Sequence, residues 1–230
     1  MSKPQAVVLD IEGTTSPLAA VHEQLFPYAR ARVADWLAEH RGAPAATEVL
    51  DGVRAELGEP GADEGRVVAT LVGWIDADVK AKPLKQLQGL IWHSGFLAGD
   101  LRGQVYPDVP VALKAWHGAG IGLHVYSSGS VAAQRDWFAH SDHGDLSGYL
   151  SGHFDLATAG PKREAESYRR ISAALGVPAA ETLFLSDVAA ELDAAVEAGW
   201  QAVGVRRPGE AHGPAGAHRW IAEFGELELS

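Results

Sequence analysis

The stretch AVVLDIEGTTSPL, residues 6–18, decides the fold of this chain. It opens with a nearly continuous apolar run, which is typical of a strand buried on both faces of a parallel sheet. Two carboxylates, Asp10 and Glu12, stand one residue apart at the end of this run, and Gly13 and Thr14 follow at once. We therefore expect a strand over residues 6–11 whose carboxyl end carries acidic side chains.

Three further segments resemble this first strand: GLHVYSS at 122–128, TLFLSD at 182–187 and QAVGVRR at 201–207. Helical patterns over 130–139 and 162–175 lie between them. Short apolar runs that alternate with helices indicate parallel strands joined by helical crossovers. The sequence therefore predicts an α/β fold with a doubly wound parallel sheet.

The span from 19 to 100 has a different pattern. It shows helical periodicity, few strand-like runs and many Gly and Pro residues between the periodic segments. Pro27 is expected to open a helix, because a mid-helix proline costs about 3 kcal/mol. We expect residues 1–18 and 101–230 to form the sheet-containing core and 19–100 to form an inserted helical cap.

Composition limits the partners. The 230 residues carry 30 Asp and Glu against 19 Lys and Arg, a formal net charge of −11, and the basic residues are scattered. This charge disfavours binding to nucleic acid or anionic membranes. The chain contains no cysteine and no apolar run approaching the roughly 18 residues of a membrane span. We expect a monomeric cytoplasmic protein. A site for an anionic substrate would have to obtain its positive potential from a metal, a lysine or helix N-termini at the site itself.

The carboxyl ends of the predicted strands bring chemistry to one edge of the sheet. Asp10 and Asp187 make a hard oxygen site suited to Mg²⁺, which prefers one or two carboxylates, waters and a substrate phosphate. A carboxylate held against Mg²⁺ can attack phosphorus, so one of the two aspartates is a candidate nucleophile. Glu12 is placed to protonate the leaving oxygen and later to activate water.

An anion site is expected beside this metal site. Ser127, Ser128 and Gly129 precede the predicted helix over 130–139, and their hydroxyl and backbone N–H groups can cradle a phosphate. Lys162, at the expected start of the helix over 162–175, adds a point charge. Together these groups predict a site that binds a phosphate ester.

Each motif alone also has an ordinary structural explanation. Asp10 and Glu12 fit turn chemistry, Ser130 after Ser-Ser-Gly fits a helix N-cap, Lys162 fits a solvated charge and Asp187 fits a helix cap. Four such motifs in this order, each after a strand or at a helix start, favour a catalytic site over a coincidence of caps.

The order of these motifs resembles the haloacid dehalogenase superfamily of aspartyl phosphotransferases. More narrowly, the chain resembles the enolase-phosphatase (acireductone synthase) family of methionine salvage along its whole length. The resemblance lies in LDIEGTTSP, LFPYARARV, LKQLQGLIW, VYSSGSVAAQ, GHFDLATAGPKREAESYRRI, LFLSDVAAELDAA and RPG.

The resemblance implies a role for each residue of the predicted site. Asp10 would be the nucleophile and a Mg²⁺ ligand, and Asp187 a second ligand. Glu12 replaces the Asp that most of the superfamily carries there; its backbone carbonyl would bind the metal and its side chain would be the acid/base. The remaining residues implied are Ser127, Ser128 and Gly129 for phosphate binding, Lys162 for charge stabilisation and Glu191 for support of the metal site.

The reaction implied by the resemblance converts 2,3-diketo-5-methylthiopentyl-1-phosphate to its enol form and then removes phosphate, giving the acireductone 1,2-dihydroxy-5-methylthiopent-1-en-3-one. The enolisation base stays open between Glu12 and a polar residue of the insert. The insert is expected to act as a lid, with Lys85, Gln88 and Trp92 on one helix face as substrate contacts. A helix with an apolar inner face and a polar outer face explains the same spacing equally well.

Two other functions compete with this one. A phosphatase of the same superfamily could act on another small phosphate ester, such as a sugar phosphate or phosphoglycolate. A phosphoacceptor switch domain could store an aspartyl-phosphate without turning it over, although a switch has no need of a lid or of Glu12. A dehalogenase would need no metal, which the pairing of Asp10 with Asp187 argues against.

Overall fold

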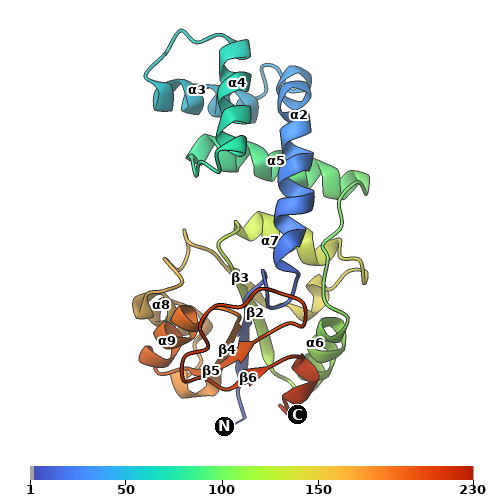
Figure 1. Cartoon of the computed structure of the whole chain (residues 1–230), viewed down its shortest axis with the longest axis vertical. Helices are drawn as coiled ribbons and strands as arrows, with labels where there is room; N and C mark the ends of the chain where they lie inside the picture. Colours follow the sequence, from blue (N-terminus) through green and yellow to red (C-terminus); the bar gives the residue numbers. More distant parts are fainter. Residues whose placement is uncertain (1–2, 230) are drawn as a thin grey trace. The chain divides into compact units, whose positions relative to one another are not determined.

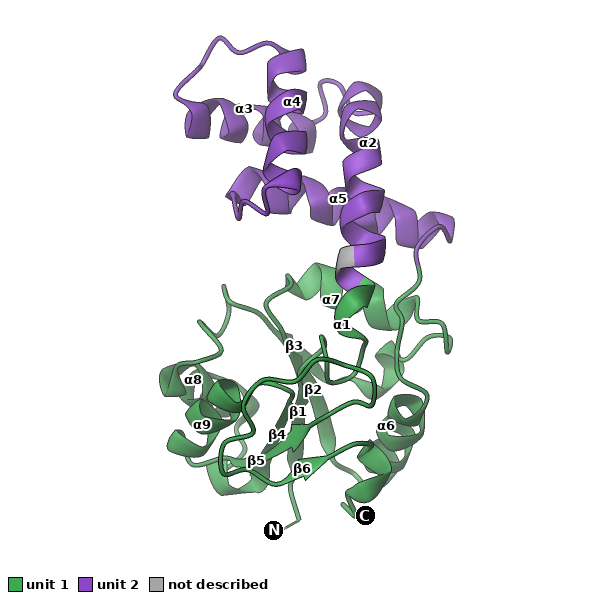
Figure 2. Ribbon diagram, in the orientation of Figure 1, with its two compact units in different colours: residues 1–20, 102–230 green, residues 21–101 purple. Residues whose placement is uncertain are grey.

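The computed structural model describes residues 3–229, apart from the side chain of His22. The chain divides into two compact units (Figure 2). The first contains the chain up to Ala20 and from Arg102 onward, and the second is Val21–Leu101. The boundaries expected from the sequence, 18/19 and 100/101, differ from these by one or two residues.

The first unit is built on a six-stranded parallel sheet (Figure 1). Its strands are β1 (Ala6–Leu9), β2 (Gly122–Tyr126), β3 (Gly152–Phe154), β4 (Thr182–Ser186), β5 (Gln201–Val205) and β6 (Trp220–Ile221). They lie in the order β3-β2-β1-β4-β5-β6, and Leu9 of β1 is in register with Val125 of β2 and Leu185 of β4. The chain reverses its direction of winding at β1, so the crevice beyond the carboxyl end of β1 is the expected ligand site of such a sheet.

All four predicted strands are present, and the doubly wound parallel sheet is confirmed. Each strand ends earlier than predicted, so that Asp10, Ser127 and Asp187 are the first residues after β1, β2 and β4. β3 and β6 were not predicted, because they have only three and two residues and lie at the two edges of the sheet.

Helices lie on both sides of the sheet in Figure 1. α8 (Ala165–Leu175) and α9 (Ala189–Glu197) pack their buried side chains against Val8 of β1 and Phe184 of β4. Side chains alternate between the faces of a strand, so Val7 and Leu9 point the other way. α6 (Asp108–Gly118) packs against β2, and α7 (Val131–Ala139) packs against β3. The short helix α1 (Leu18–Ala20) is the last element of the first unit before the chain enters the second unit.

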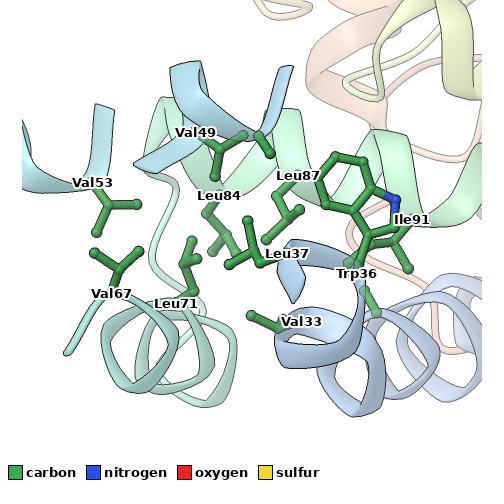
Figure 3. Close-up of a cluster of buried hydrophobic side chains, with 12 residues drawn as sticks. Val33, Trp36, Leu37, Val49, Val53, Val67, Leu71, Leu84, Leu87 and Ile91 are labelled. Atoms are coloured by element: carbon green, nitrogen blue, oxygen red, sulfur yellow. The ribbon is translucent and has the colours of Figure 1, made fainter. Parts of the chain in front are cut away.

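The second unit is helical. It contains a π-helical turn, η1 (Val21–Leu25), followed by α2 (Phe26–Glu39), α3 (Pro44–Leu57), α4 (Glu64–Asp76) and α5 (Lys82–Ala98). Their apolar faces enclose one cluster that includes Val33, Leu71 and Leu87 (Figure 3). Burial of these apolar faces against one another supplies the driving force for this packing. No helix within residues 3–229 is both long and apolar enough to cross a bilayer.

The expectation that Pro27 opens a helix is confirmed, because Pro27 lies in the first turn of α2. Helical backbone already begins at Leu18 and runs through the π-helical turn into α2, in which Pro27 is the second residue. The missing N–H of Pro27 therefore falls where the hydrogen-bonding pattern changes from π to α, and the chain continues through it.

Candidate active site

Asp10 occupies the carboxyl end of β1 and is 4% exposed. Its backbone N–H still belongs to the sheet, because it donates to Leu185 O at 3.0 Å. Its side-chain Oδ1 accepts from the N–H of Ile11 at 2.7 Å. The sheet therefore fixes the backbone of Asp10, and the first peptide after the strand orients its carboxylate.

Lys162 is the cation of the site. Its Nζ lies 2.6 Å from Asp10 Oδ1 and 2.7 Å from Glu191 Oε2, and all three side chains are at most 10% exposed. Burial lowers the pKa of Lys162, but the charges of Asp10 and Glu191 outweigh burial, so its pKa lies above the usual lysine value. Lys162 is therefore a permanent positive charge between two buried carboxylates.

The sequence predicted that Lys162 stands at the start of a helix, and this prediction is wrong. It lies in a turn, and α8 begins three residues later at Ala165. The turn is instead fixed by its backbone, since the hydroxyl of Tyr168 donates to Lys162 O at 2.7 Å. The lysine reaches Asp10 because a buried tyrosine of the following helix holds its main chain.

Asp187 and Glu191 follow β4, which pairs with β1, the strand that ends just before Asp10. The hydroxyl of Ser186 lies 2.9 Å from Glu191 Oε2 and 3.3 Å from Asp10 Oδ2, which links the two carboxylates. Burial, and after it the negative charges of Asp10 and Glu191, raise the pKa of Asp187 to about 7. The pKa of Glu191 is also raised, first by burial and then by Asp10. Both carboxylates are therefore costly to ionise, because they are partly desolvated and lie beside other negative charges, and a bound cation would offset this cost.

Gly13 brings the loop after β1 close to Asp187. Its φ is +70°, and a Cβ at this position would lie 2.6 Å from Asp187 Oδ2. Only glycine tolerates both the left-handed backbone and this approach. The half-buried Glu12 precedes it, and its backbone forms a bridge to Ser16. The glycine of the opening motif thus holds the acidic loop against the second aspartate.

The Ser127–Ser128–Gly129 segment follows β2 as predicted, but two of its three backbone N–H donors are already used. The N–H of Ser127 donates to Phe154 O at 3.2 Å, and the N–H of Gly129 donates to Ser127 Oγ at 3.3 Å. The N-cap role of Ser130 is confirmed, because its side chain accepts from Ala133 N. Of the predicted hydroxyl and backbone N–H groups, the side-chain hydroxyls are therefore the better candidates for phosphate binding.

The three residues expected to contact substrate from the insert lie in different environments on α5. Lys85 is exposed, whereas Gln88 is 6% exposed within the helical unit. Trp92 is half-buried and its indole N–H donates to Leu25 O at 2.8 Å. Helical spacing alone therefore does not give the three side chains a common exposure.

Three features near the site were not predicted. The side chain of Gln134 donates to both Gly129 O and Phe154 O at 2.8 Å and so ties the serine segment to β3. Tyr106 OH donates to Glu210 Oε1 at 2.6 Å. Arg207 is buried and binds the loop after β1. Gln134 and Arg207 belong to the motifs VYSSGSVAAQ and RPG, but nothing in local sequence reveals what they contact.

A buried Asp–Lys pair beyond the central strand of a doubly wound sheet defines the class of this enzyme. Residues 4–199 match the sequence model of the haloacid dehalogenase-like hydrolase family. The fold and the site therefore belong to a hydrolase of that class.

Relatives narrow the class. Enolase-phosphatase E1 of Nocardia farcinica is 60% identical over 98% of this chain and 97% of its own length. Enolase-phosphatase E1 of Frankia alni is 52% identical over 100% and 99% of the two chains. The crystal structure of the UTR4 protein of Saccharomyces cerevisiae is 33% identical, with a TM-score of 0.83 over 97% of this chain and 100% of that one. The chain belongs to the enolase-phosphatase E1 family of haloacid dehalogenase-like hydrolases.

Proposed function

We propose that this protein is a Mg²⁺-dependent enolase-phosphatase of methionine salvage. It would convert 2,3-diketo-5-methylthiopentyl-1-phosphate through its enol form to 1,2-dihydroxy-5-methylthiopent-1-en-3-one and phosphate. The observation that carries the phosphatase chemistry is Asp10, buried at the end of β1 and bound by Lys162 at 2.6 Å. The family supports the choice of substrate.

The donor set fits Mg²⁺. The site gathers Asp10, Asp187 and Glu191 around one cation, Lys162, and the pKa of Asp187 is raised first by burial and then by the other two carboxylates. No group of three or more Asp, Glu or His side chains within residues 3–229 is arranged to hold a metal. Two carboxylates, Asp10 and Asp187, with the backbone carbonyl of Glu12 would suffice, because Mg²⁺ keeps waters and takes substrate phosphate oxygens. When bound, it would neutralise phosphoryl charge and polarise the neighbouring carbonyl.

Asp10 is the proposed nucleophile. Its Oδ1 is held by the N–H of Ile11 and by Lys162, whereas within residues 3–229 Oδ2 has only a 3.3 Å contact, with the Ser186 hydroxyl. Oδ2 would attack phosphorus, and the bond from phosphorus to the ester oxygen would break as the aspartyl-phosphate forms. Lys162 would stabilise the negative charge on the phosphoryl oxygens, and Ser127 and Ser128 would bind them.

Glu12 is the proposed acid and base. It would donate a proton to the departing ester oxygen and then accept one from the water that attacks the aspartyl-phosphate. Hydrolysis returns Asp10 as a carboxylate, releases phosphate and leaves Glu12 protonated for the next cycle. Glu191 would act indirectly, by holding Lys162 beside Asp10.

Enolisation would use the same site. A base removes a proton from the carbon that bears the phosphate ester, and the neighbouring carbonyl oxygen becomes the enol oxygen. Glu12 and a polar residue of the helical unit are the two candidate bases. Lys85, Gln88 and Trp92 are the proposed substrate contacts of that unit, and the exposed ammonium of Lys85 is the most accessible of their polar groups. We propose a monomer in the cytoplasm that needs no nucleic acid or membrane.

The decisive experiment compares the diketo phosphate with a panel of sugar phosphates and phosphoglycolate, following enol absorbance and phosphate release together. The proposal predicts an enol signal and many turnovers with the diketo phosphate, and much lower kcat/KM with the other esters. A preference for an ordinary ester without an enol signal would indicate a phosphatase of different specificity. One phosphate per protein would indicate a phosphoacceptor switch.

A further inference from the structure

Arg207 is an unusual residue of the first unit, because its long charged side chain is only 2% exposed. It follows the end of β5, and its guanidinium lies 4.4 Å from the ring centroid of Tyr106 and 4.7 Å from that of Phe224. A planar guanidinium packed against two aromatic rings has little freedom to reorient. Its N–H groups are therefore aimed in fixed directions.

Those N–H groups connect three segments of the chain. Nε donates to Thr14 O at 2.8 Å, in the loop that follows β1. Nη1 donates to Asp108 Oδ2 at 2.8 Å, at the start of α6, and to Ala222 O at 3.2 Å. Asp108 Oδ2 also accepts from the N–H of Phe224 at 2.7 Å, which holds the carboxylate in place. Arg207 thus ties the loop after β1 to two segments outside it.

A contribution to stability is a weak explanation of this arrangement. Replacing a buried ion pair by apolar residues is often neutral or stabilising, because desolvation offsets the attraction between the charges. Arg207 carries a further cost, since its Nη2 is buried without a hydrogen-bond partner among residues 3–229. A side chain kept under these conditions is better explained by the position it imposes on what it binds.

What Arg207 binds is the loop that carries Glu12. The loop is closed on itself, because Gly13 N donates to Ser16 O at 2.8 Å and Thr14 N donates to Ile11 O at 3.1 Å. Thr15 Oγ1 donates back to Asp10 O at 3.0 Å, so the same loop is attached to the nucleophile. In so tight a loop, a shift of the Thr14 carbonyl must move Glu12, which is two residues away.

We propose that Arg207 is a positioning residue that fixes Glu12 through the Thr14 carbonyl, so that Glu12 can protonate the leaving oxygen. The inference rests on the proposed function, because it presumes that Glu12 is the general acid. Arg207 itself does not contact the reacting atoms. Its loss would weaken proton donation rather than nucleophilic attack.

The dependence of kcat/KM on the leaving group of the phosphate ester tests this positioning role directly. Good leaving groups such as p-nitrophenolate need little proton donation, whereas alkoxides need it, and general acid catalysis contributes about 10²–10⁴-fold. In Arg207→Met, kcat/KM should fall at least about tenfold more for an alkyl phosphate than for p-nitrophenyl phosphate. Glu12→Gln should show the same pattern more strongly. The double variant should be no worse than Glu12→Gln alone, because both changes remove one function.

The neighbouring arginine supplies a matched control. Arg206 also lies over an aromatic ring, that of Trp220 at 4.6 Å, and also donates to a carbonyl, Gly213 O at 2.8 Å. That carbonyl belongs to a surface loop rather than to the loop after β1. Arg206→Met should therefore leave the leaving-group dependence unchanged.

Amide hydrogen exchange gives a readout that does not depend on turnover. Exchange in residues 11–16 should rise in Arg207→Met while that of β1 stays protected, and Arg206→Met should change neither. If Arg207→Met does not fold, Arg207→Lys serves instead, because a lysine keeps the charge beside Asp108 but cannot also hold Thr14. Equal rate losses for both esters, or unchanged exchange in the loop, would overturn the positioning role alone. A leaving-group series unaffected by Glu12→Gln would overturn the acid role of Glu12 and this inference with it.

Discussion

The two units of this protein bury different kinds of side chain. The helical unit encloses an apolar cluster that includes Val33, Leu71 and Leu87 (Figure 3). Its ion pairs, such as Arg30–Asp76, lie at the surface. The sheet-containing unit buries Asp10 and Lys162 at the end of its central strand. Apolar burial stabilises a fold directly, whereas buried charges cost desolvation and must be paired. The comparison indicates that the charged cluster is kept for its chemistry.

The largest expected effect is the loss of turnover in Asp10→Asn. The amide is nearly isosteric but is a much weaker nucleophile than a carboxylate, so phosphate release should fall at least about a thousandfold. Circular dichroism should show an unchanged fold, because the strand and its register do not depend on this charge. Substantial residual release by the purified variant would remove Asp10 as the nucleophile.

Lys162→Met should affect both activity and stability. It leaves Asp10 and Glu191 buried without their cation, and breaking a buried pair in this way costs about 3–5 kcal/mol. Urea denaturation of the metal-free protein at pH 8 measures this loss, and phosphate release should fall as well. Arg163→Met is the control, because Arg163 is the exposed neighbour in the same turn. Equal stability of the two variants would show that the cluster does not depend on its lysine.

Leu87→Ala should destabilise the helical unit by about 2–5 kcal/mol, through lost transfer energy and a cavity. Leu87 is fully buried in the apolar cluster, whereas Leu97 on the same helix is 65% exposed. Leu97→Ala should therefore leave the denaturation midpoint nearly unchanged. Similar midpoints for the two variants would contradict the view that apolar packing carries the stability of this unit.

Features with a local signal in the sequence could be predicted, whereas contacts between distant parts of the chain could not. Apolar periodicity is a local signal, so β1, β2, β4, β5 and the helical character of the insert followed from sequence. β3 and β6 were too short to produce such a signal. The order of the motifs predicted which residues share the end of the sheet. The pairing of Lys162 with both carboxylates and the reach of Arg207 to Thr14 join distant parts of the chain, so no spacing rule could reveal them.

Stability of the metal-free protein should depend on pH through Asp187. Its pKa is raised from 3.8 to about 7 by burial and by the nearby carboxylates, so between these values the folded state binds more protons than the unfolded state. This contribution to stability is present at low pH and is lost as pH rises toward 7. The half-buried His153, whose pKa is lowered to about 4 chiefly by burial, acts in the opposite sense, so the comparison must be made against Asp187→Asn.

Thermal melts at pH 5.5 and pH 8 measure this effect. The wild type should lose more stability than Asp187→Asn on going to pH 8, and Mg²⁺ should raise the melting temperature of the wild type more at pH 8 than at pH 5.5. Parallel pH profiles of the two proteins would show that Asp187 does not carry the excess charge of the site.

The smallest expected effect concerns the surface charges of the helical unit. Arg30 contacts Asp76 through two hydrogen bonds, Nε to Oδ1 at 2.6 Å and Nη2 to Oδ2 at 2.8 Å, yet both side chains are 50% exposed. Water and salt screen such a pair, and ordering two long side chains opposes it, so its net contribution is small. Arg30→Ala should shift the urea midpoint far less than Leu87→Ala, and added salt should reduce the shift further. A loss as large as that of Leu87→Ala would mean that charge pairing holds the helical unit together as well, and the contrast between the two units would disappear.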